Sequence, residues 1–161
     1  VVLVVLAIAT ACGPESSPVA TVPDEAPAPA PPKQLVLPDS AYRAELTLRA
    51  PLAKGAAGTT ATATVSVKNV TGTAWPEHRS DFAINLTYHW RNREGSIVVY
   101  DGVRTPLTVA LAPGQAAEFQ AAVRFPPSAG DYILEFDLVQ EWVTWFADKG
   151  SATARVDVRV E

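Results

Sequence analysis

Aromatic side chains near the ends of extended segments are the residues of this sequence best suited to bind a ligand. Trp75 precedes a proline in a loop, Trp145 lies near a hairpin tip, and Tyr100 ends a short apolar segment. Planar aromatic faces stack on sugar rings, and exposed Trp and Tyr also anchor protein interfaces. Arg104 follows Asp101 closely and either bonds a sugar hydroxyl or pairs with that carboxylate. The sequence therefore predicts a ligand site at Trp75, Tyr100, Arg104 and Trp145.

The other two tryptophans follow an inward pattern. Trp90 ends an alternating apolar row that starts at Ile84, and Trp142 is in phase with the apolar row from Leu134 to Leu138. Side chains two apart on a strand share a face. We therefore expect Trp90 and Trp142 in the core.

Groups for catalysis or metal binding are few. His78 and His89 are the only histidines and lack the H-x-H or H-x-x-x-H spacing of a zinc site, and His89 falls on an outward row. Glu135 and Asp137 lie two apart on a strand face where solvated charges are expected. The sequence therefore predicts a protein that is not an enzyme and that uses no catalytic residue, cofactor or structural metal.

Calcium is an alternative for the loop carboxylates only. These are Asp81, Asp101, Asp131 and Asp148, and none belongs to a D-x-D-x-D-G loop. The net charge of −4 and the lack of a basic run exclude nucleic acid as an expected partner.

The single cysteine, Cys12, follows a short apolar run, Val1–Ala9, and the small residues Thr10 and Ala11. This arrangement resembles the lipobox of bacterial lipoproteins, in which the apolar region is removed and the new N-terminal Cys is acylated. The resemblance implies a signal-peptide remnant at 1–11, lipidation at Cys12 and an extracytoplasmic, membrane-anchored protein of the bacterial cell envelope. The alternative is an ordinary signal peptide or transmembrane helix in which Cys12 is incidental.

Residues 12–40 are rich in Pro and Ala, which offer little apolar surface to bury and, for Pro, no backbone donor. We expect an extended linker that holds the following domain away from a membrane, or a tail without a role.

Residues 41–161 contain all four Trp, all four Tyr and all five Phe, and they predict a single all-β domain. Alternating apolar and polar residues occur at 42–48, 61–67, 84–90, 97–100, 107–111, 117–125, 132–138 and 154–160. Turn signals separate these segments, among them Asn92–Gly95 and Ala112–Gln115. The spacing predicts an antiparallel β-sandwich of seven to nine strands, with 132–138 near its centre.

Two further features favour an immunoglobulin-like sandwich. Trp90 lies where such folds often bury a Trp, and Gly130-Asp131-Tyr132 resembles the tyrosine corner, in which the hydroxyl bonds upstream backbone. A single cysteine leaves no partner for the inter-sheet disulfide of antibody domains.

Several short motifs in residues 60–160 also resemble an Ig-like accessory domain of bacterial glycosyltransferases, methyltransferases and surface-polysaccharide proteins. They are Asn69, Gly72, Trp75-Pro76, Leu86–Trp90, Asp101-Gly102, Arg104-Thr105, Leu107, Pro113-Gly114, Gly130–Tyr132, Asp137–Glu141 and Trp145-Phe146. The resemblance implies a non-catalytic domain that binds carbohydrate or a partner protein.

Two functions follow as expectations. The first is a non-catalytic, lipid-anchored binding module of the cell envelope, with polysaccharide as the candidate ligand. The alternative is a structural or protein-interaction lipoprotein that docks an envelope protein, through an edge strand for example.

Overall fold

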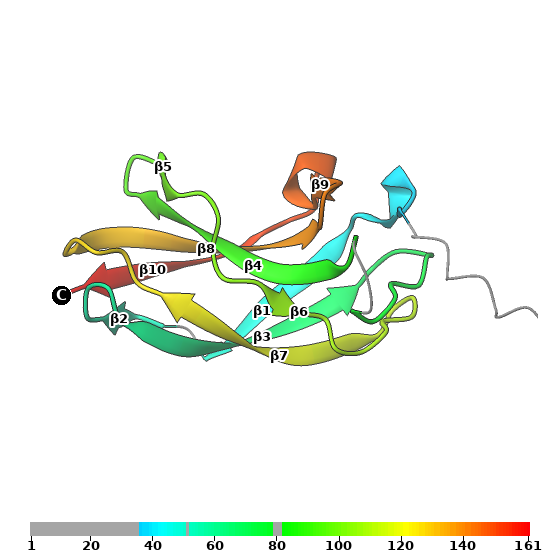
Figure 1. Ribbon diagram of the computed structural model, residues 1–161, viewed down its shortest axis with the longest axis horizontal. Coiled ribbons are helices and arrows are strands. Elements are labelled where there is room, and N and C mark those ends of the chain that lie inside the picture. Colours follow the sequence, from blue (N-terminus) through cyan, green and yellow to red (C-terminus); the bar gives the residue numbers. More distant parts are fainter. Residues whose placement is uncertain (1–35, 51, 79–81) are drawn as a thin grey trace, which may run out of the picture. The chain divides into compact units, whose positions relative to one another are not determined.

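The computed structural model describes residues 36–50, 52–78 and 82–161. These residues form ten strands, two short 3₁₀ helices and no α-helix (Figure 1). The elements are η1 (Asp39–Ala41), β1 (Ala44–Ala50), β2 (Lys54–Gly55), β3 (Thr60–Asn69), β4 (Ile84–Asn92), β5 (Ile97–Val99), β6 (Thr105–Pro106), β7 (Ala116–Arg124), β8 (Gly130–Gln140), β9 (Thr144–Trp145), η2 (Ala147–Lys149) and β10 (Ala154–Val160).

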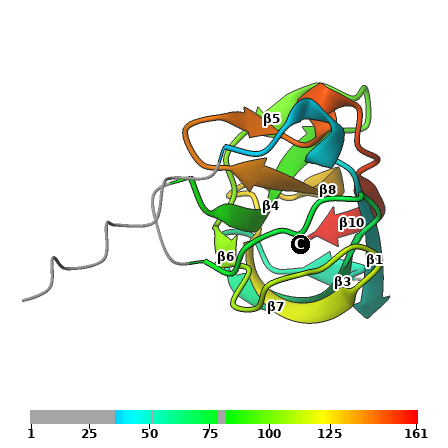
Figure 2. The ribbon, with the colours of Figure 1, turned by 90° about the vertical axis from the view of Figure 1, so that its right-hand side faces the viewer.

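The strands form the two layers of a sandwich (Figure 2). One sheet has the order β1-β3-β7, and the other has the order β2-β10-β8-β4-β5, with β6 paired to β4 and β9 to β8. All pairs are antiparallel except β2 with β10. This arrangement confirms the predicted all-β, immunoglobulin-like fold, with β8 between β4 and β10. The described residues form ten strands instead of the predicted seven to nine, because the two-residue strands β2, β6 and β9 are too short to show an alternating pattern.

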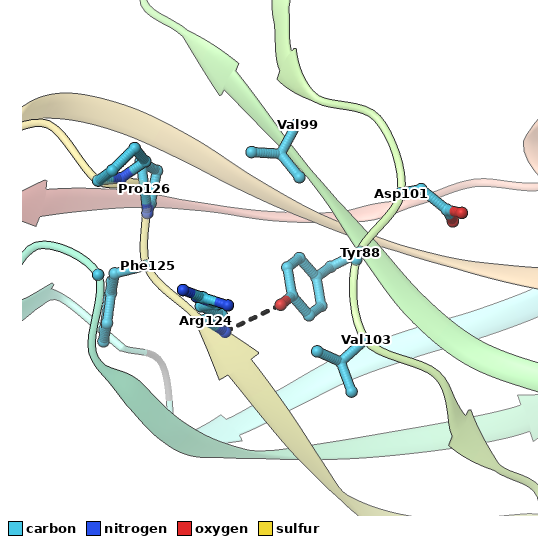
Figure 3. A pocket seen from close by; sticks show the side chains of 10 residues that line it. Tyr88, Val99, Asp101, Val103, Arg124, Phe125 and Pro126 are labelled. Carbon is cyan, nitrogen blue, oxygen red and sulfur yellow. Dashed lines mark hydrogen bonds between the residues drawn. The ribbon is translucent and has the colours of Figure 1, made fainter.

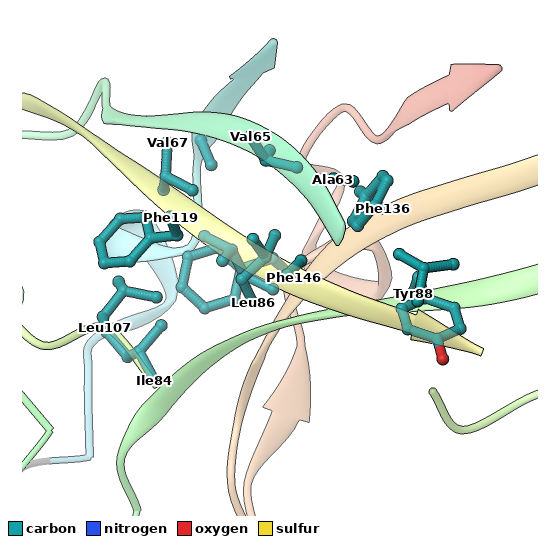
Figure 4. Close-up of a cluster of buried hydrophobic side chains, with 14 of the residues drawn as sticks. Ala63, Val65, Val67, Ile84, Leu86, Tyr88, Leu107, Phe119, Phe136 and Phe146 are labelled. Atoms are coloured by element: carbon teal, nitrogen blue, oxygen red, sulfur yellow. The ribbon is translucent and has the colours of Figure 1, made fainter. Parts of the chain in front are cut away.

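The core lies between the sheets because each strand turns one face inward. Leu86 and Phe136 of the larger sheet meet Val65 and Phe119 of the smaller one (Figure 4), and all four are buried. Each such side chain contributes about 1.5–3 kcal/mol by leaving water.

Two predicted Ig-like features are present. Trp90 is fully buried, and its Nε1 donates a 2.9 Å hydrogen bond to the carbonyl of Arg124 on the facing sheet. The hydroxyl of Tyr132 donates to the carbonyl of Ser128 at 3.1 Å, so this residue forms the predicted tyrosine corner.

The segment 107–111 is not the predicted strand. Leu107 and Leu111 are buried, but the only bridge in this segment joins Leu111 to Trp75, and the paired residues before it are Thr105 and Pro106 of β6. β6 pairs with β4 of the larger sheet, whereas β7 lies in the smaller one. The segment therefore connects the two layers, and its apolar residues fill the edge of the core.

The sandwich begins before the predicted boundary at residue 41. Leu37 is buried in the core cluster, and its amide donates a 3.2 Å hydrogen bond to Oε1 of Gln140. The predicted signal-peptide remnant at 1–11, the lipidation residue Cys12 and the linker up to residue 35 lie outside the described residues, as does Asp81.

Candidate functional site

The outer face of the β4–β8 pair is covered by protein, although the alternation predicts a solvated face. His89 on β4 and Glu135 and Asp137 on β8 do point away from the core, yet they are only 6%, 2% and 1% exposed. β9 folds back on the end of β8, with Trp145 opposite Val139. The prediction that these polar residues are solvated is therefore wrong.

Aromatic rings form part of this cover. The ring of Trp145 lies 4.5 Å from that of His89 and 5.4 Å from that of Tyr100. Nδ1 of His89 is hydrogen-bonded to the carbonyl of Tyr100. The loop after β5 and the hairpin after β8 therefore meet over the imidazole.

Glu135 is held by two arginines. Its carboxylate accepts hydrogen bonds from Arg91 on β4, and from Arg155 and Thr153 at the start of β10. Burial by itself would raise the pKa of Glu135, but these hydrogen bonds outweigh it and hold the pKa below its ordinary value. The carboxylate of Glu135 therefore links β8 to its neighbours β4 and β10.

Asp137 secures the segment that follows β9. Its Oδ1 accepts from the amide of Leu138 at 2.7 Å, and its Oδ2 accepts from the amide of Ala147 at 3.2 Å. Burial raises the pKa of Asp137 to about 6 against these two hydrogen bonds, and the charges of Glu135 and Asp148 add to the rise.

Three of the four predicted ligand residues meet in one cleft, which we call the β8–β9 cleft. It has a volume of about 520 Å³ and is lined by Tyr100, Asp101, Arg104, Val139, Gln140, Glu141, Trp142, Val143, Thr144, Trp145 and Asp148. The structure therefore brings Tyr100, Arg104 and Trp145 together although 45 positions separate the first from the last.

Arg104 joins several residues of this cleft. Its guanidinium lies 5.3 Å from the centroid of the Trp145 ring, Nε donates to Glu141 at 2.7 Å, and Nη1 donates to Asp101. Burial would lower the pKa of Arg104, but the bonds to Asp101 and Glu141 outweigh it and raise the pKa above its ordinary value. The pairing with Asp101, one of two roles expected for Arg104, is confirmed.

Trp142 lies in the cleft, so the prediction that the apolar alternation places it in the core is wrong. Its side chain is 86% exposed, and its φ of 63° lies in the left-handed region that a bulky residue rarely adopts. The amide of Val143 donates to the carbonyl of Gln140 at 3.0 Å, so the chain turns after β8 and the alternation stops. The W-x-x-W spacing across this hairpin is the sequence signal that could have indicated a paired aromatic site.

Trp75 is excluded from any ligand site in this structure. It is fully buried, its ring packs edge-on against Phe146 at 5.3 Å, and its Nε1 donates to the carbonyl of Ala41 at 2.9 Å. The bridge between Trp75 and Leu111 draws the loop residue inward. The prediction of Trp75 as a ligand contact is wrong because neither ring face reaches solvent.

One buried polar atom near the cleft has no partner. Asn85 on β4 is 3% exposed, and its Nδ2 donates to Oε1 of Glu141 at 2.7 Å. Among the described residues, Oδ1 of Asn85 accepts no hydrogen bond. An unpaired buried acceptor costs free energy that a donor would recover.

A second cleft, the β5–β7 cleft, opens between the layers and has a volume of about 500 Å³. Its walls include Val99 and Val103 on one side and Phe125 and Pro126 on the other (Figure 3). The hydroxyl of Tyr88 accepts the amide hydrogen of Arg124 at 2.8 Å. This cleft is mainly apolar.

Within the described part of the chain, no three His, Cys, Asp or Glu side chains are grouped closely enough to hold a metal ion. The same residues contain no helix with the length and apolarity needed to cross a bilayer.

No family model matches the chain, and the curated proteins contain no match to its sequence. Among solved structures, the CARDB domain of PF1109 from Pyrococcus furiosus is 19% identical, with a TM-score of 0.41 over 73% of this chain and 95% of that one. The sporulation control protein Spo0M from Bacillus subtilis is 14% identical, with a TM-score of 0.46 over 74% of this chain and 49% of that one. A PapD-like domain of human CEP192 is 14% identical, with a TM-score of 0.34 over 80% of this chain and 90% of that one. These likenesses concern the Ig-like fold alone.

Proposed function

We propose that this chain is a non-catalytic binding module of the bacterial cell envelope that takes carbohydrate in the β8–β9 cleft. The observation that carries the proposal is the convergence of Tyr100, Trp142 and Trp145 around Arg104 in a cleft of about 520 Å³. Trp142 and Tyr100 are 86% and 55% exposed, so both present ring surface to a ligand. Sugar rings stack on such faces through their C–H groups.

Polar groups in the cleft suit the hydroxyls of a sugar. Among the described contacts, Arg104 donates through Nε and Nη1 to protein oxygens, and its Nη2 donates to none. Oε1 of Glu141 accepts from Asn85 and Arg104, and these bonds fix the side chain in the cleft wall. A few fixed donors and acceptors beside an apolar surface are typical of small-ligand sites.

The bonding of the polar groups supports a non-catalytic role. Glu135 is clamped by two arginines, and Asp137 accepts two backbone hydrogen bonds beneath the cover. Nδ1 of His89 is hydrogen-bonded to the carbonyl of Tyr100. A general acid or base must reach the reacting atoms, whereas these groups hold the cover in place.

The lipid anchor belongs to the same proposal and rests on the sequence around Cys12. Acyl chains on one residue hold a protein on a membrane through about 0.8 kcal/mol per buried CH₂. Metabolic labelling with palmitate, followed by membrane fractionation, tests it. We expect label on the wild-type protein and a soluble, unlabelled Cys12→Ser variant; an unlabelled wild type contradicts the anchor.

Glycan-array binding tests the ligand class directly. We expect Trp142→Ala and Trp145→Ala to weaken binding about fivefold or more, because stacking of a planar base on one aromatic ring contributes roughly 1–3 kcal/mol and a sugar ring is expected at the low end of that range. Val98→Ala is the matched control, since Val98 is exposed on β5 and does not line the cleft. Equal binding by all three variants, or none by the wild type to any envelope polysaccharide, contradicts the proposal.

A second candidate function is docking of an envelope protein on the β5 edge. Ile97, Val98 and Val103 are 40%, 47% and 45% exposed beside the apolar β5–β7 cleft. β5 is the last strand in its sheet, and an edge strand can accept a strand from a partner. Crosslinking in membranes tests this function. Val98→Lys should abolish crosslinks while Trp142→Ala leaves them intact, and the opposite result excludes the β5 edge.

A further inference from the structure

The charge of the β8–β9 cleft is negative. Asp101, Glu141 and Asp148 line it with one cation, Arg104. The guanidinium is already paired with Asp101 and Glu141, so its positive charge is balanced before any ligand arrives. The excess charge therefore favours cationic ligands over anionic ones.

Asp148 is the carboxylate available for a new ion pair. It is exposed at the first turn of η2, and it forms no hydrogen bond or ion pair with the described residues. Its neighbour Lys149 points its charge elsewhere, donating to Asp39 at 2.8 Å. A cation in the cleft meets this carboxylate without displacing an existing partner.

Aromatic faces add to this preference. Trp142, Trp145 and Tyr100 line the cleft, and Trp145 already receives a cation, Arg104, at 5.3 Å from its ring centroid. The negative face of an aromatic ring attracts ammonium groups, by about 0.5–2 kcal/mol depending on solvation. Trp142 is free to contact a second cation because it is 86% exposed.

Asn85 orients one of the cleft carboxylates from behind the cleft wall. Oδ1 of Asn85 is buried, and Nδ2 of this side chain is bonded to Glu141 of the cleft. The lining itself presents the carboxylates of Asp101, Glu141 and Asp148, which accept hydrogen bonds from the N–H groups of a cationic ligand.

We propose, as an extension of the carbohydrate function, that the cleft selects hexosamines whose amino group is free and protonated. The amine would pair with Asp148 while the sugar ring stacks on Trp142. Uronic acids, which carry a carboxylate, would be rejected by the like charges of Asp101, Glu141 and Asp148.

Oligosaccharides that differ mainly in charge test the proposal on the full chain by calorimetry at mildly acidic pH and low salt. The probes are a chitosan tetramer with free amines, the chitin tetramer with the same linkages and acetylated amines, and an anionic oligogalacturonate. We expect chitosan to bind about two- to fivefold more tightly than chitin, because one exposed ion pair with Asp148 contributes up to about fivefold, and we expect oligogalacturonate not to bind.

Two variants locate the effect. Asp148→Asn should reduce the preference for chitosan about two- to fivefold and leave chitin binding unchanged. Asp157→Asn is the matched control, since it makes the same charge change on β10 outside the cleft, where Asp157 pairs with Arg93.

The outcomes separate this inference from the function on which it rests. Equal affinity for chitin and chitosan overturns the selection for free amines and leaves carbohydrate binding in place. Binding of chitosan and polylysine alike, unaffected by Asp148→Asn, shows adsorption of any polycation and overturns the inference. Binding of no oligosaccharide, here or on the array, overturns the carbohydrate function too.

Discussion

The guanidinium of Arg104 lies 5.3 Å from the centroid of the Trp145 ring, and this contact joins the loop after β5 to the hairpin after β8. Arg104 also donates to Glu141 at 2.7 Å, so the stacked ring and the cleft carboxylate depend on one side chain. These contacts therefore hold the lining of the cleft in place.

Arg104→Lys should lower the free energy of unfolding by about 1 kcal/mol, because an ammonium cannot both stack on Trp145 and bond two carboxylates. Urea denaturation measures the change. Arg93→Lys is the control, since Arg93 forms an exposed ion pair with Asp157 at 3.6 Å, and it should shift stability by less than about 0.5 kcal/mol. Equal effects of the two substitutions would show that the Arg104 contacts add nothing.

Trp142→Asn should raise the free energy of unfolding by about 0.5–1 kcal/mol. The backbone of Trp142 has a φ of 63°, which Asn tolerates and Trp does not, and the exposed ring makes little compensating contact. Trp142→Val is the comparison, because a β-branched residue is strained further at this φ and should be less stable than wild type. A loss of stability in Trp142→Asn contradicts this explanation. Ligand binding should be weakened in both variants by about as much as in Trp142→Ala.

Trp75→Ala should lower the free energy of unfolding by about 3–5 kcal/mol, since it empties a fully buried site and leaves the carbonyl of Ala41 without its indole donor. Trp142→Ala, at an exposed site, should change stability by no more than about 1 kcal/mol. Thermal unfolding of the two variants side by side distinguishes a core tryptophan from a surface one. A stable Trp75→Ala variant would place Trp75 outside the core.

The stability of the domain should fall as pH rises through about 6 because of Asp137. The pKa of Asp137 is raised from 3.8 to about 6 in the folded state. The contribution of Asp137 to the free energy of unfolding is therefore fully present below pH 3.8, and it is lost as the pH rises from there through about 6 and the carboxyl ionises in the folded protein. The expected loss from pH 5 to 7 is about 1 kcal/mol.

Urea midpoints at about pH 5 and pH 7 check this dependence. Asp137→Asn should flatten it, whatever its effect on absolute stability. Glu135 acts in another window, because its lowered pKa makes its contribution disappear only as pH falls below the ordinary range of a carboxyl. An unchanged pH dependence in Asp137→Asn would assign the effect to another group.

The alternation of apolar residues was enough to predict the sandwich and its central strand. It identified the rows that contain Trp90 and Leu134, because a buried face enforces a period of two. It could not show that the opposite face of β8 is buried too. That burial depends on Tyr100 and Trp145, which reach β8 only through tertiary structure.

The candidate site was predicted only in part, because contacts made through tertiary structure decide which aromatic rings are exposed. Tyr100, Arg104 and Trp145 were named from their residue types and meet in one cleft. The predicted environments of Trp75 and Trp142 are the reverse of the observed ones. The bridge to Leu111 places Trp75 in the core, and the turn at Trp142 reverses the chain and leaves that ring in solvent. Neither a single β-bridge nor one residue with a left-handed backbone changes the alternation of apolar residues, so the sequence pattern could not predict either feature.

The indole N–H resonances of the four tryptophans test the binding site most directly. We propose titrating the chitosan tetramer, and any glycan selected on the array, into labelled protein, with each resonance assigned by a Trp→Phe variant. The account predicts that the signals of Trp142 and Trp145 move while those of Trp75 and Trp90, bonded to the carbonyls of Ala41 and Arg124, stay in place. Saturable binding that leaves the Trp142 and Trp145 signals unmoved would contradict it.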